Sequence, residues 1–171
     1  MNLDDLPPPE LMWEGKFIRA LRRGKWEYAS RARDIRAVVI LAEHDGKMIL
    51  VDQPRAGPDC RCVELPAGLV GDVDPDATIE ATAIKELEEE TGFTADRVER
   101  LGDFYSSPGM LAEAFTLVRV HGVRRIGAGG GDDNEDINVH LVVRADIDNF
   151  LEQKRAEGFG IDVKLLLLLN Y

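Results

Sequence analysis

Short segments in which apolar and polar residues alternate occupy the first third of the chain. Alternation with a period of two is typical of strands that bury one face, so each segment predicts a strand. The pair Asp45-Gly46 separates two of them and indicates a tight hairpin. The prolines at 7–9 predict an extended arm at the start. The predicted strands are KFIRALRR (16–23), KWEYASR (25–31), RAVVILAEH (36–44) and KMILVDQ (47–53).

The remainder of the chain combines further strands with three helical segments. We expect a helix from about Ala77 to Thr91, ended by Gly92 in the usual manner of a helix C-terminus. Two loops are predicted, PRAGPDCRC (54–62) and the acidic GAGGGDDNED (127–136), which its glycines should make flexible. The other predicted strands are 63–70, 97–107, 112–123 and 137–144, and the other helices are 145–158 and 162–171. Because strands outnumber helices and one helix is inserted among them, the pattern predicts an α+β sandwich.

The end of the central helix carries a group of acids in an unfavourable place. Glu86, Glu89 and Glu90 crowd its last two turns, where the helix dipole disfavours negative charge by roughly 0.3–1 kcal/mol each. At about 100° per residue, Glu86 and Glu90 share a stripe with Ile79 and Ala83, which packs inward. Most glutamate runs form a solvated face, but these acids lie against the buried face. A divalent cation bound by oxygen ligands, Mg²⁺ or Mn²⁺, would offset their charge and suggests phosphoanhydride chemistry.

Charge and composition narrow the class of protein. A length of 171 residues with 44% hydrophobic and 31% charged residues is that of one globular domain. A net charge of −11 argues against a nucleic-acid partner, although arginines gather over 19–36 and would help to hold an anionic substrate. The acidic start MNLDDLPPPE is unlike a signal peptide and no apolar run is long enough to span a bilayer. Cys60 and Cys62 are interpreted as ordinary thiols, so we expect a cytoplasmic protein without a membrane partner.

The stretch Gly68–Phe93, GLVGDVDPDATIEATAIKELEEETGF, resembles the Nudix box, G-x5-E-x7-R-E-U-x-E-E-x-G-U, where U is a bulky apolar residue. The second half of the motif fits residue by residue from Glu86 to Phe93. The first half departs from it, because about three extra residues follow Gly68 and the motif's lone Glu and its Arg fall on Ala77 and Lys85. In the family these two form a salt bridge, so Lys85 is expected to pair with Glu80, Asp76 or Glu89 instead.

The resemblance extends from about Trp26 to Leu169 and favours the ADP-ribose pyrophosphatase-like subgroup. It rests on VDQPR (51–55), ELPAG (64–68), YSSPGMLAE (105–113) and DDNEDINVH (132–140), and on Pro108, which stands fifteen residues beyond Phe93. It implies a Nudix-type α/β/α sandwich with a mixed sheet and N-terminal antiparallel strands. We therefore expect an arm with strands over 1–34 that mediates homodimerisation, and a Nudix hydrolase domain over 35–171.

The resemblance also implies roles for individual residues. Glu86, Glu89 and Glu90, with the backbone carbonyl of Ala67, would hold the metal ions, and Glu89 is also a candidate catalytic group. Glu135 would be the general base or a further metal ligand, and Asp133 competes with it for either role. The candidate substrate contacts are Arg55, Arg33 with its neighbours Arg31 and Arg36, Glu113 and Pro108.

The predicted function is Mg²⁺- or Mn²⁺-dependent hydrolysis of the pyrophosphate bond of a nucleoside diphosphate sugar. ADP-ribose, cleaved to AMP and ribose 5-phosphate, is the first choice, and GDP-mannose or another sugar nucleotide is the alternative. A second alternative is a catalytically weak Nudix-like sensor, because Ala77 and Lys85 depart from the box.

Overall fold

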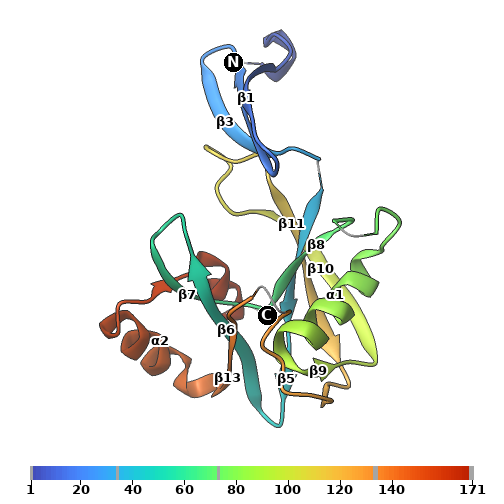
Figure 1. The fold of residues 1–171 in the computed structure, drawn as a ribbon, viewed down its shortest axis with the longest axis vertical. Coiled ribbons are helices and arrows are strands. Elements are labelled where there is room, and N and C mark those ends of the chain that lie inside the picture. Colours follow the sequence, from blue (N-terminus) through green and yellow to red (C-terminus); the bar gives the residue numbers. More distant parts are fainter. Residues whose placement is uncertain (1, 34, 73, 133–134, 170–171) are drawn as a thin grey trace.

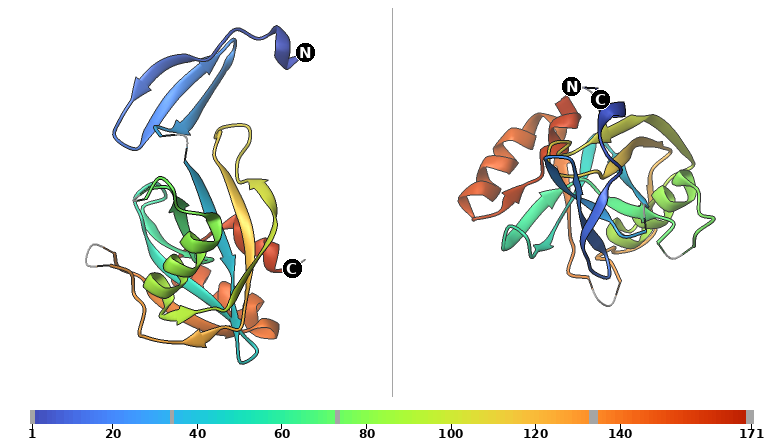
Figure 2. Two further views of the ribbon diagram at one scale, coloured as in Figure 1. Left: turned by 90° about the vertical axis from the view of Figure 1, so that its right-hand side faces the viewer. Right: turned by 90° about the horizontal axis from the view of Figure 1, so that it is seen from above.

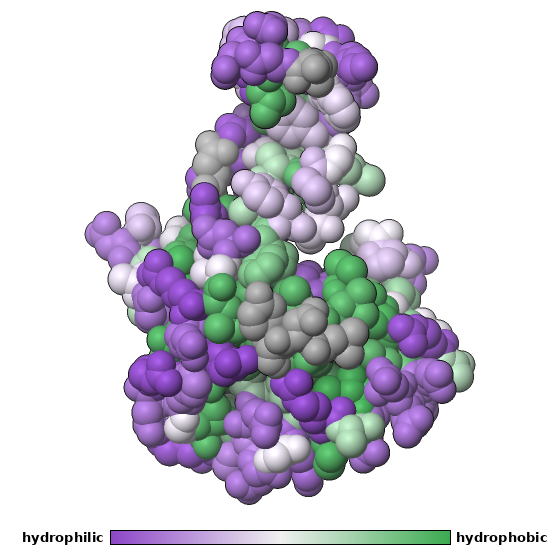
Figure 3. All heavy atoms as spheres, turned by 180° about the vertical axis from the view of Figure 1, so that it is seen from behind, coloured by the Kyte–Doolittle hydropathy of each residue, from purple (hydrophilic) through white to green (hydrophobic). Residues whose placement is uncertain are grey.

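A small N-terminal sheet projects from a larger body (Figure 1). The computed structural model describes residues 2–33, 35–72, 74–132 and 135–169. After a short 3₁₀ helix, η1 (Leu3–Asp5), three strands form an antiparallel meander: β1 (Glu10–Glu14), β2 (Ile18–Arg23) and β3 (Trp26–Arg31). From the side (Figure 2, left) and from behind (Figure 3) the projection is narrower than the body.

Two mixed sheets form most of the body. Their strands are β4 (Arg36–Leu41), β5 (Glu43–His44), β6 (Lys47–Arg55), β7 (Cys60–Glu64), β8 (Ala67–Val70), β10 (Arg97–Tyr105), β11 (Ala114–His121), β13 (Asn138–Val143) and β14 (Gly160–Ile161). One sheet has the order β10-β11-β4-β8, and the other has the order β13-β6-β7-β14 with β5 beside β6. The pairs β11–β4 and β14–β7 are parallel, and the rest are antiparallel. A separate small pair joins β9 (Phe93–Thr94) to β12 (Arg124–Arg125).

Helices cover the two sides of this arrangement (Figure 1). They are α1 (Ile79–Glu86) with a π turn (Leu87–Thr91), η3 (Arg144–Asp146), α2 (Ile147–Ala156) and the 3₁₀ helix η4 (Val163–Leu169). The strand β4 is buried on both faces, which explains its uninterrupted apolar sequence. Val38 and Ile40 pack in the core beneath α1, whereas Val39 and Leu41 pack in a second core with both sheets, α2 and η4. The expected mixed α+β class is confirmed.

Several predicted boundaries were wrong for local reasons. The central helix begins at Ile79, two residues later than expected, because Thr78 caps it by accepting a hydrogen bond from the Ala81 amide at 3.1 Å. The predicted loop over 54–62 contains the start of β7, and 63–70 is two strands interrupted at Leu65-Pro66. The strand β1 was not predicted, and the last helix is a 3₁₀ helix. Within the described ranges, no helix combines the length and the apolar character needed to cross a bilayer.

Candidate functional site

The central helix ends in a π turn that carries two of the three motif glutamates. Leu87 and Thr91 are fully buried in this turn, and Glu90 is only 4% exposed. The wider turn is stabilised by the Thr91 hydroxyl, which donates to the Leu87 carbonyl, and by Gly92, whose φ of 73° lets its amide donate to the Glu88 carbonyl at 3.0 Å. Single π turns inside α-helices often occur at functional sites.

Two of these carboxylates lie against the strand β8. Glu90 Oε2 accepts a hydrogen bond from the Ala67 amide at 3.1 Å. Glu86 packs on Gly68 so closely that a Cβ at position 68 would overlap its Cγ and Cδ. Ala67 and Gly68 are small enough to lie against the acids. The side chains of Glu86 and Glu90 therefore contact neighbouring residues of β8.

Burial makes these two acids reluctant to ionise. The pKa of Glu90 is raised to about 8, chiefly by burial and further by the charges of Glu86, Glu135 and Glu64, although the Ala67 amide opposes the change. The pKa of Glu86 is raised to about 7, again chiefly by burial, and Lys85 only partly offsets this. A bound cation would reduce both the repulsion between these carboxylates and the cost of burying their charge.

Glu89 has an ion-pair partner of its own. It forms an ion pair with Lys85 one turn earlier, and this hydrogen bond is the main reason why the pKa of Lys85 is raised. In the part of the chain that the structure describes, no three acidic, imidazole or thiol side chains form a closed ligand set. Mg²⁺ commonly takes only one or two protein carboxylates, with water and substrate phosphate completing its octahedron. The all-oxygen donors Glu86 and Glu90 fit this mode of binding.

The structure also shows what replaces the family's Glu–Arg pair. Of the three partners expected for Lys85, it takes Glu89. The first turn of α1 is instead attached to β10 by Arg100, whose Nε and Nη2 donate to the two carboxylate oxygens of Glu80 at 2.6 and 2.9 Å. The helix is therefore fastened at its start by Arg100 and at its end by the π turn.

The glycine-rich loop at 127–131 packs on the end of this helix, contrary to the prediction of a flexible loop. The amides of Gly130 and Gly131 donate to the carbonyls of Glu90 and Glu89 at 2.9 and 3.0 Å. A Cβ at Gly129, whose φ is 74°, would overlap the Thr91 backbone. Glycine therefore serves close approach here, and the loop supplies donors to carbonyls that a helix end leaves unpaired.

This loop brings Glu135 to the acids of the helix. Glu135 Oε2 accepts a hydrogen bond from the Asp132 amide at 3.1 Å, and its charge contributes to the raised pKa values of both Glu86 and Glu90. Asp133, the predicted competitor for the role of base, lies outside the described residues. Of the two candidates, Glu135 is therefore the one that the structure describes next to Glu86 and Glu90.

Arg55 faces the same site from the end of β6. Its Nε and Nη2 each donate to a carboxylate oxygen of Glu64 at 2.7 Å. Glu64 is 5% exposed, whereas 46% of the Arg55 side chain is exposed, and Glu90 is close enough to contribute to the raised pKa of Arg55. Sequence reasoning assigned no role to Glu64; its position immediately before Leu-Pro-Ala-Gly was the available signal.

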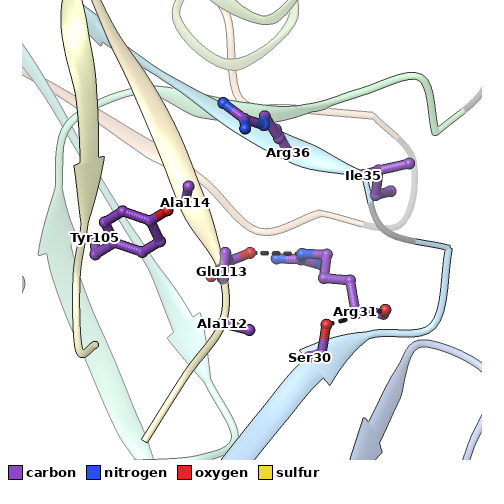
Figure 4. A pocket seen from close by; sticks show the side chains of 8 residues that line it. All are labelled: Ser30, Arg31, Ile35, Arg36, Tyr105, Ala112, Glu113 and Ala114. Carbon is purple, nitrogen blue, oxygen red and sulfur yellow. Dashed lines mark hydrogen bonds and ion pairs between the residues drawn. The ribbon is translucent and has the colours of Figure 1, made fainter. Parts of the chain in front are cut away.

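The other predicted substrate contacts lie where the N-terminal sheet meets the body. Arg31 Nε donates to Glu113 Oε1 at 2.5 Å across a cavity of about 190 Å³ (Figure 4). Arg36 also lines this cavity, but Arg33 pairs with Asp72 and Pro108 lies in an exposed turn. The cavity is lined by Ser30, Arg31, Ile35, Arg36, Tyr105, Ala112, Glu113 and Ala114.

The strand β8 relates the cavity to the acids. Arg36 at the start of β4 is opposite Val70, and Val39 is opposite Ala67, which binds Glu90. Three residues of strand span roughly 10 Å. The position opposite Arg36, which lines the cavity, is therefore about 10 Å along β8 from Ala67, which binds Glu90.

Comparisons with known proteins show which family the chain resembles. A family model described as the NUDIX domain matches residues 32–158. The chain is 30% identical over 135 residues to the methanol dehydrogenase activator of Bacillus methanolicus, covering 78% of this chain and 69% of that protein. It is 36% identical over 116 residues to the GDP-mannose pyrophosphatase of Enterobacter sp. (strain 638), covering 67% and 56%. It is 44% identical over 78 residues to the ADP-ribose pyrophosphatase of Bacillus subtilis (strain 168), covering 45% and 40%.

A solved structure shows the same fold. The crystal structure of an ADP compounds hydrolase superposes with a TM-score of 0.67 and 20% sequence identity, covering 86% of this chain and 82% of that one. The matches to the two pyrophosphatases span only about half of their lengths. The NUDIX domain model, however, matches most of this chain, and that match shows the family. This chain belongs to the Nudix family.

Proposed function

We propose that the protein hydrolyses the pyrophosphate bond of a nucleoside diphosphate sugar with the help of Mg²⁺ or Mn²⁺. ADP-ribose, giving AMP and ribose 5-phosphate, is the preferred substrate in this proposal. The observation that carries it is the pair of acids at the helix end, the buried Glu90 and the half-buried Glu86, which lie against β8 and have raised pKa values, beside the partly exposed guanidinium of Arg55. Cation and guanidinium together suit a dianionic pyrophosphate.

In this proposal the acids of the helix end hold the metal. Glu86 and Glu90 would be the principal ligands, and the Ala67 carbonyl and Glu89 would be the further donors. When bound, the metal neutralises charge on the phosphate oxygens and lowers the pKa of a bound water. Glu86 and Glu90 then ionise fully, because the cation reverses the effect of burial on their pKa values.

The remaining groups bind and orient the substrate and move the proton. Glu135 accepts the proton of the attacking water, and its proximity to Glu86 and Glu90 supports this role. Arg55 contacts a phosphate through the exposed part of its guanidinium while Glu64 fixes its plane. Glu113, Arg31 and Arg36 receive the nucleoside end in the cavity, about 10 Å along β8 from the acids.

We further propose that the N-terminal unit mediates homodimerisation, as the division into 1–34 and 35–171 suggests. Its small sheet exposes large apolar side chains that it cannot bury by itself. They are Leu11, Met12, Trp13, Phe17, Ile18 and Trp26, each between 46% and 63% exposed. Sedimentation should give twice the chain mass. A cytoplasmic location and the lack of nucleic-acid and membrane partners also stay predictions.

GDP-mannose is the second candidate substrate. The alignment to the Enterobacter GDP-mannose pyrophosphatase covers more of this chain than the alignment to the Bacillus ADP-ribose pyrophosphatase, 67% against 45%. The test is a panel of ADP-ribose, GDP-mannose and other sugar nucleotides incubated with Mg²⁺, with the products separated by chromatography. Release of AMP from ADP-ribose at the highest kcat/KM is the expected result. Tight binding of ADP-ribose without product release would instead indicate a sensor.

A further inference from the structure

The reverse side of the second sheet holds a buried polar cluster that the proposed chemistry does not use. Its centre is Asp52 in β6, which is 1% exposed. Arg61 Nε and Asn138 Nδ2 donate to Asp52 Oδ1 at 2.6 and 3.0 Å, and His140 Nε2 lies 2.5 Å from Oδ2. Burial would raise the pKa of Asp52, but these hydrogen bonds outweigh it and the pKa is lowered. A buried carboxylate satisfied this completely is a rigid anchor.

Arg61 connects this anchor to the loop that carries Glu135. Its Nη1 donates to Asp136 Oδ2 at 2.6 Å, and its Nη2 donates to the carbonyl of Asp136 at 2.9 Å and to that of Asp52 at 3.1 Å. Every nitrogen of the guanidinium is thus committed, and two of the bonds fix both the side chain and the backbone of the residue next to Glu135. A planar fork of this kind sets orientation as well as distance.

The alternation of side chains along this segment explains how the contact of Arg61 with Asp136 can orient the neighbouring side chain of Glu135. Asp136 and Asn138 are two residues apart and both reach the Asp52–Arg61 cluster, as alternate positions of an extended chain do. Glu135 and Ile137 occupy the other set of alternate positions. Ile137 is 7% exposed, and the charge of Glu135 acts on Glu86 and Glu90. The loop is fastened on its other side by Gly130 and Gly131, as described above.

We propose that Arg61 is a positioning residue, which fixes Asp136 to the buried Asp52 and thereby holds the Glu135 carboxylate toward the acids of the helix end. The inference rests on the proposed role of Glu135 as the base. The inference assigns a function to a cluster on the side of the sheet that does not face the carboxylates.

The kinetic test is a double-mutant cycle between Arg61→Gln and Glu135→Gln, measured on ADP-ribose with saturating Mg²⁺. Arg61→Gln is expected to lower kcat by about 10- to 100-fold, as a misplaced group can, with KM changed less than about threefold. In the Glu135→Gln background the same change should have no further effect, because Arg61 acts through Glu135. Multiplied losses would overturn the proposal. Arg124→Gln, which breaks the exposed ion pair with Asp96, is the matched control and should leave kcat unchanged.

A second readout does not depend on activity. In Arg61→Gln, hydrogen exchange of the amides at 127–137 should become at least tenfold faster, while exchange in α1 stays the same. Unchanged exchange in this loop would refute the clamp even if the enzyme were active, and faster exchange without any hydrolysis by the wild type would refute the proposed function alone. Asp136→Ala removes the side-chain bond to Arg61 without removing a partner of Asp52, so it serves if Arg61→Gln fails to fold.

Discussion

Replacing Glu90 with glutamine should stabilise the metal-free protein at alkaline pH while removing its activity. The pKa of Glu90 is raised to about 8 from an ordinary value of 4.5, mainly by burial. The folded protein therefore holds this proton more tightly than the unfolded chain does. The stability that depends on Glu90 is fully present below pH 4.5 and declines as the pH rises through 8.

The size of the effect follows from the same difference. At about 1.4 kcal/mol for each tenfold change in proton affinity, ionising Glu90 in the folded protein costs about 4–5 kcal/mol well above pH 8. A glutamine would accept the Ala67 hydrogen bond but would leave its own NH₂ group unpaired, which costs about 1–3 kcal/mol. Glu90→Gln should therefore be more stable than the wild type by about 2–3 kcal/mol at pH 9, and less stable by about 1 kcal/mol at pH 5.

Urea unfolding in EDTA at pH 5 and pH 9 measures this reversal. Glu88→Gln, a neutralisation in the same turn at a partly exposed position, is the control and should change stability by less than about 0.5 kcal/mol at either pH. Saturating Mg²⁺ should restore the stability of the wild type at pH 9 and leave Glu90→Gln almost unaffected. If the wild type were the more stable protein at pH 9 in EDTA, the reasoning from burial would be refuted.

Three further substitutions test other contacts of the site. Gly68→Ala places a methyl group on the Glu86 side chain and should lower kcat/KM by about 10- to 100-fold in Mg²⁺ titrations, with little change in Tm. Arg55→Lys loses the two-bond fork to Glu64 and should lower kcat/KM on ADP-ribose about tenfold; an unchanged value would remove Arg55 from the substrate site. Thr78→Ala removes the cap of α1 and should reduce the free energy of unfolding by about 1 kcal/mol without altering kcat.

The pattern of the central helix was the most predictable part of the site. Helical periodicity alone put Glu86 and Glu90 on the inward stripe, and the structure buries Glu90 and places Glu86 against Gly68. Periodicity predicted neither the π turn nor the amides of Gly130 and Gly131, about forty residues later in the chain, which donate to carbonyls of this turn. A local pattern predicts which face of a helix is buried, but it does not predict which distant groups hydrogen-bond to the helix end.

The errors in strands and loops have the same origin. Turn residues at 56–59 suggested a loop through Cys62, yet pairing with β6 draws Cys60 into β7. Glycines at 127–131 suggested flexibility, yet they permit close packing on the helix. The cluster around Asp52 joins residues from three strands, so no short motif indicated it. In the last two cases a contact between distant segments overrode a local preference, whereas β7 extends a hairpin with the neighbouring β6.

The central claim is that the acids at the helix end bind a divalent metal that the hydrolysis of a sugar nucleotide requires. The most direct measurement is AMP release from ADP-ribose by the wild type and Glu90→Gln, each with Mg²⁺ and with excess EDTA. We expect release by the wild type in Mg²⁺ only, and a kcat at least about 100-fold lower for Glu90→Gln at every Mg²⁺ concentration. Release that persists in EDTA, or equal rates for the two proteins, would contradict the account.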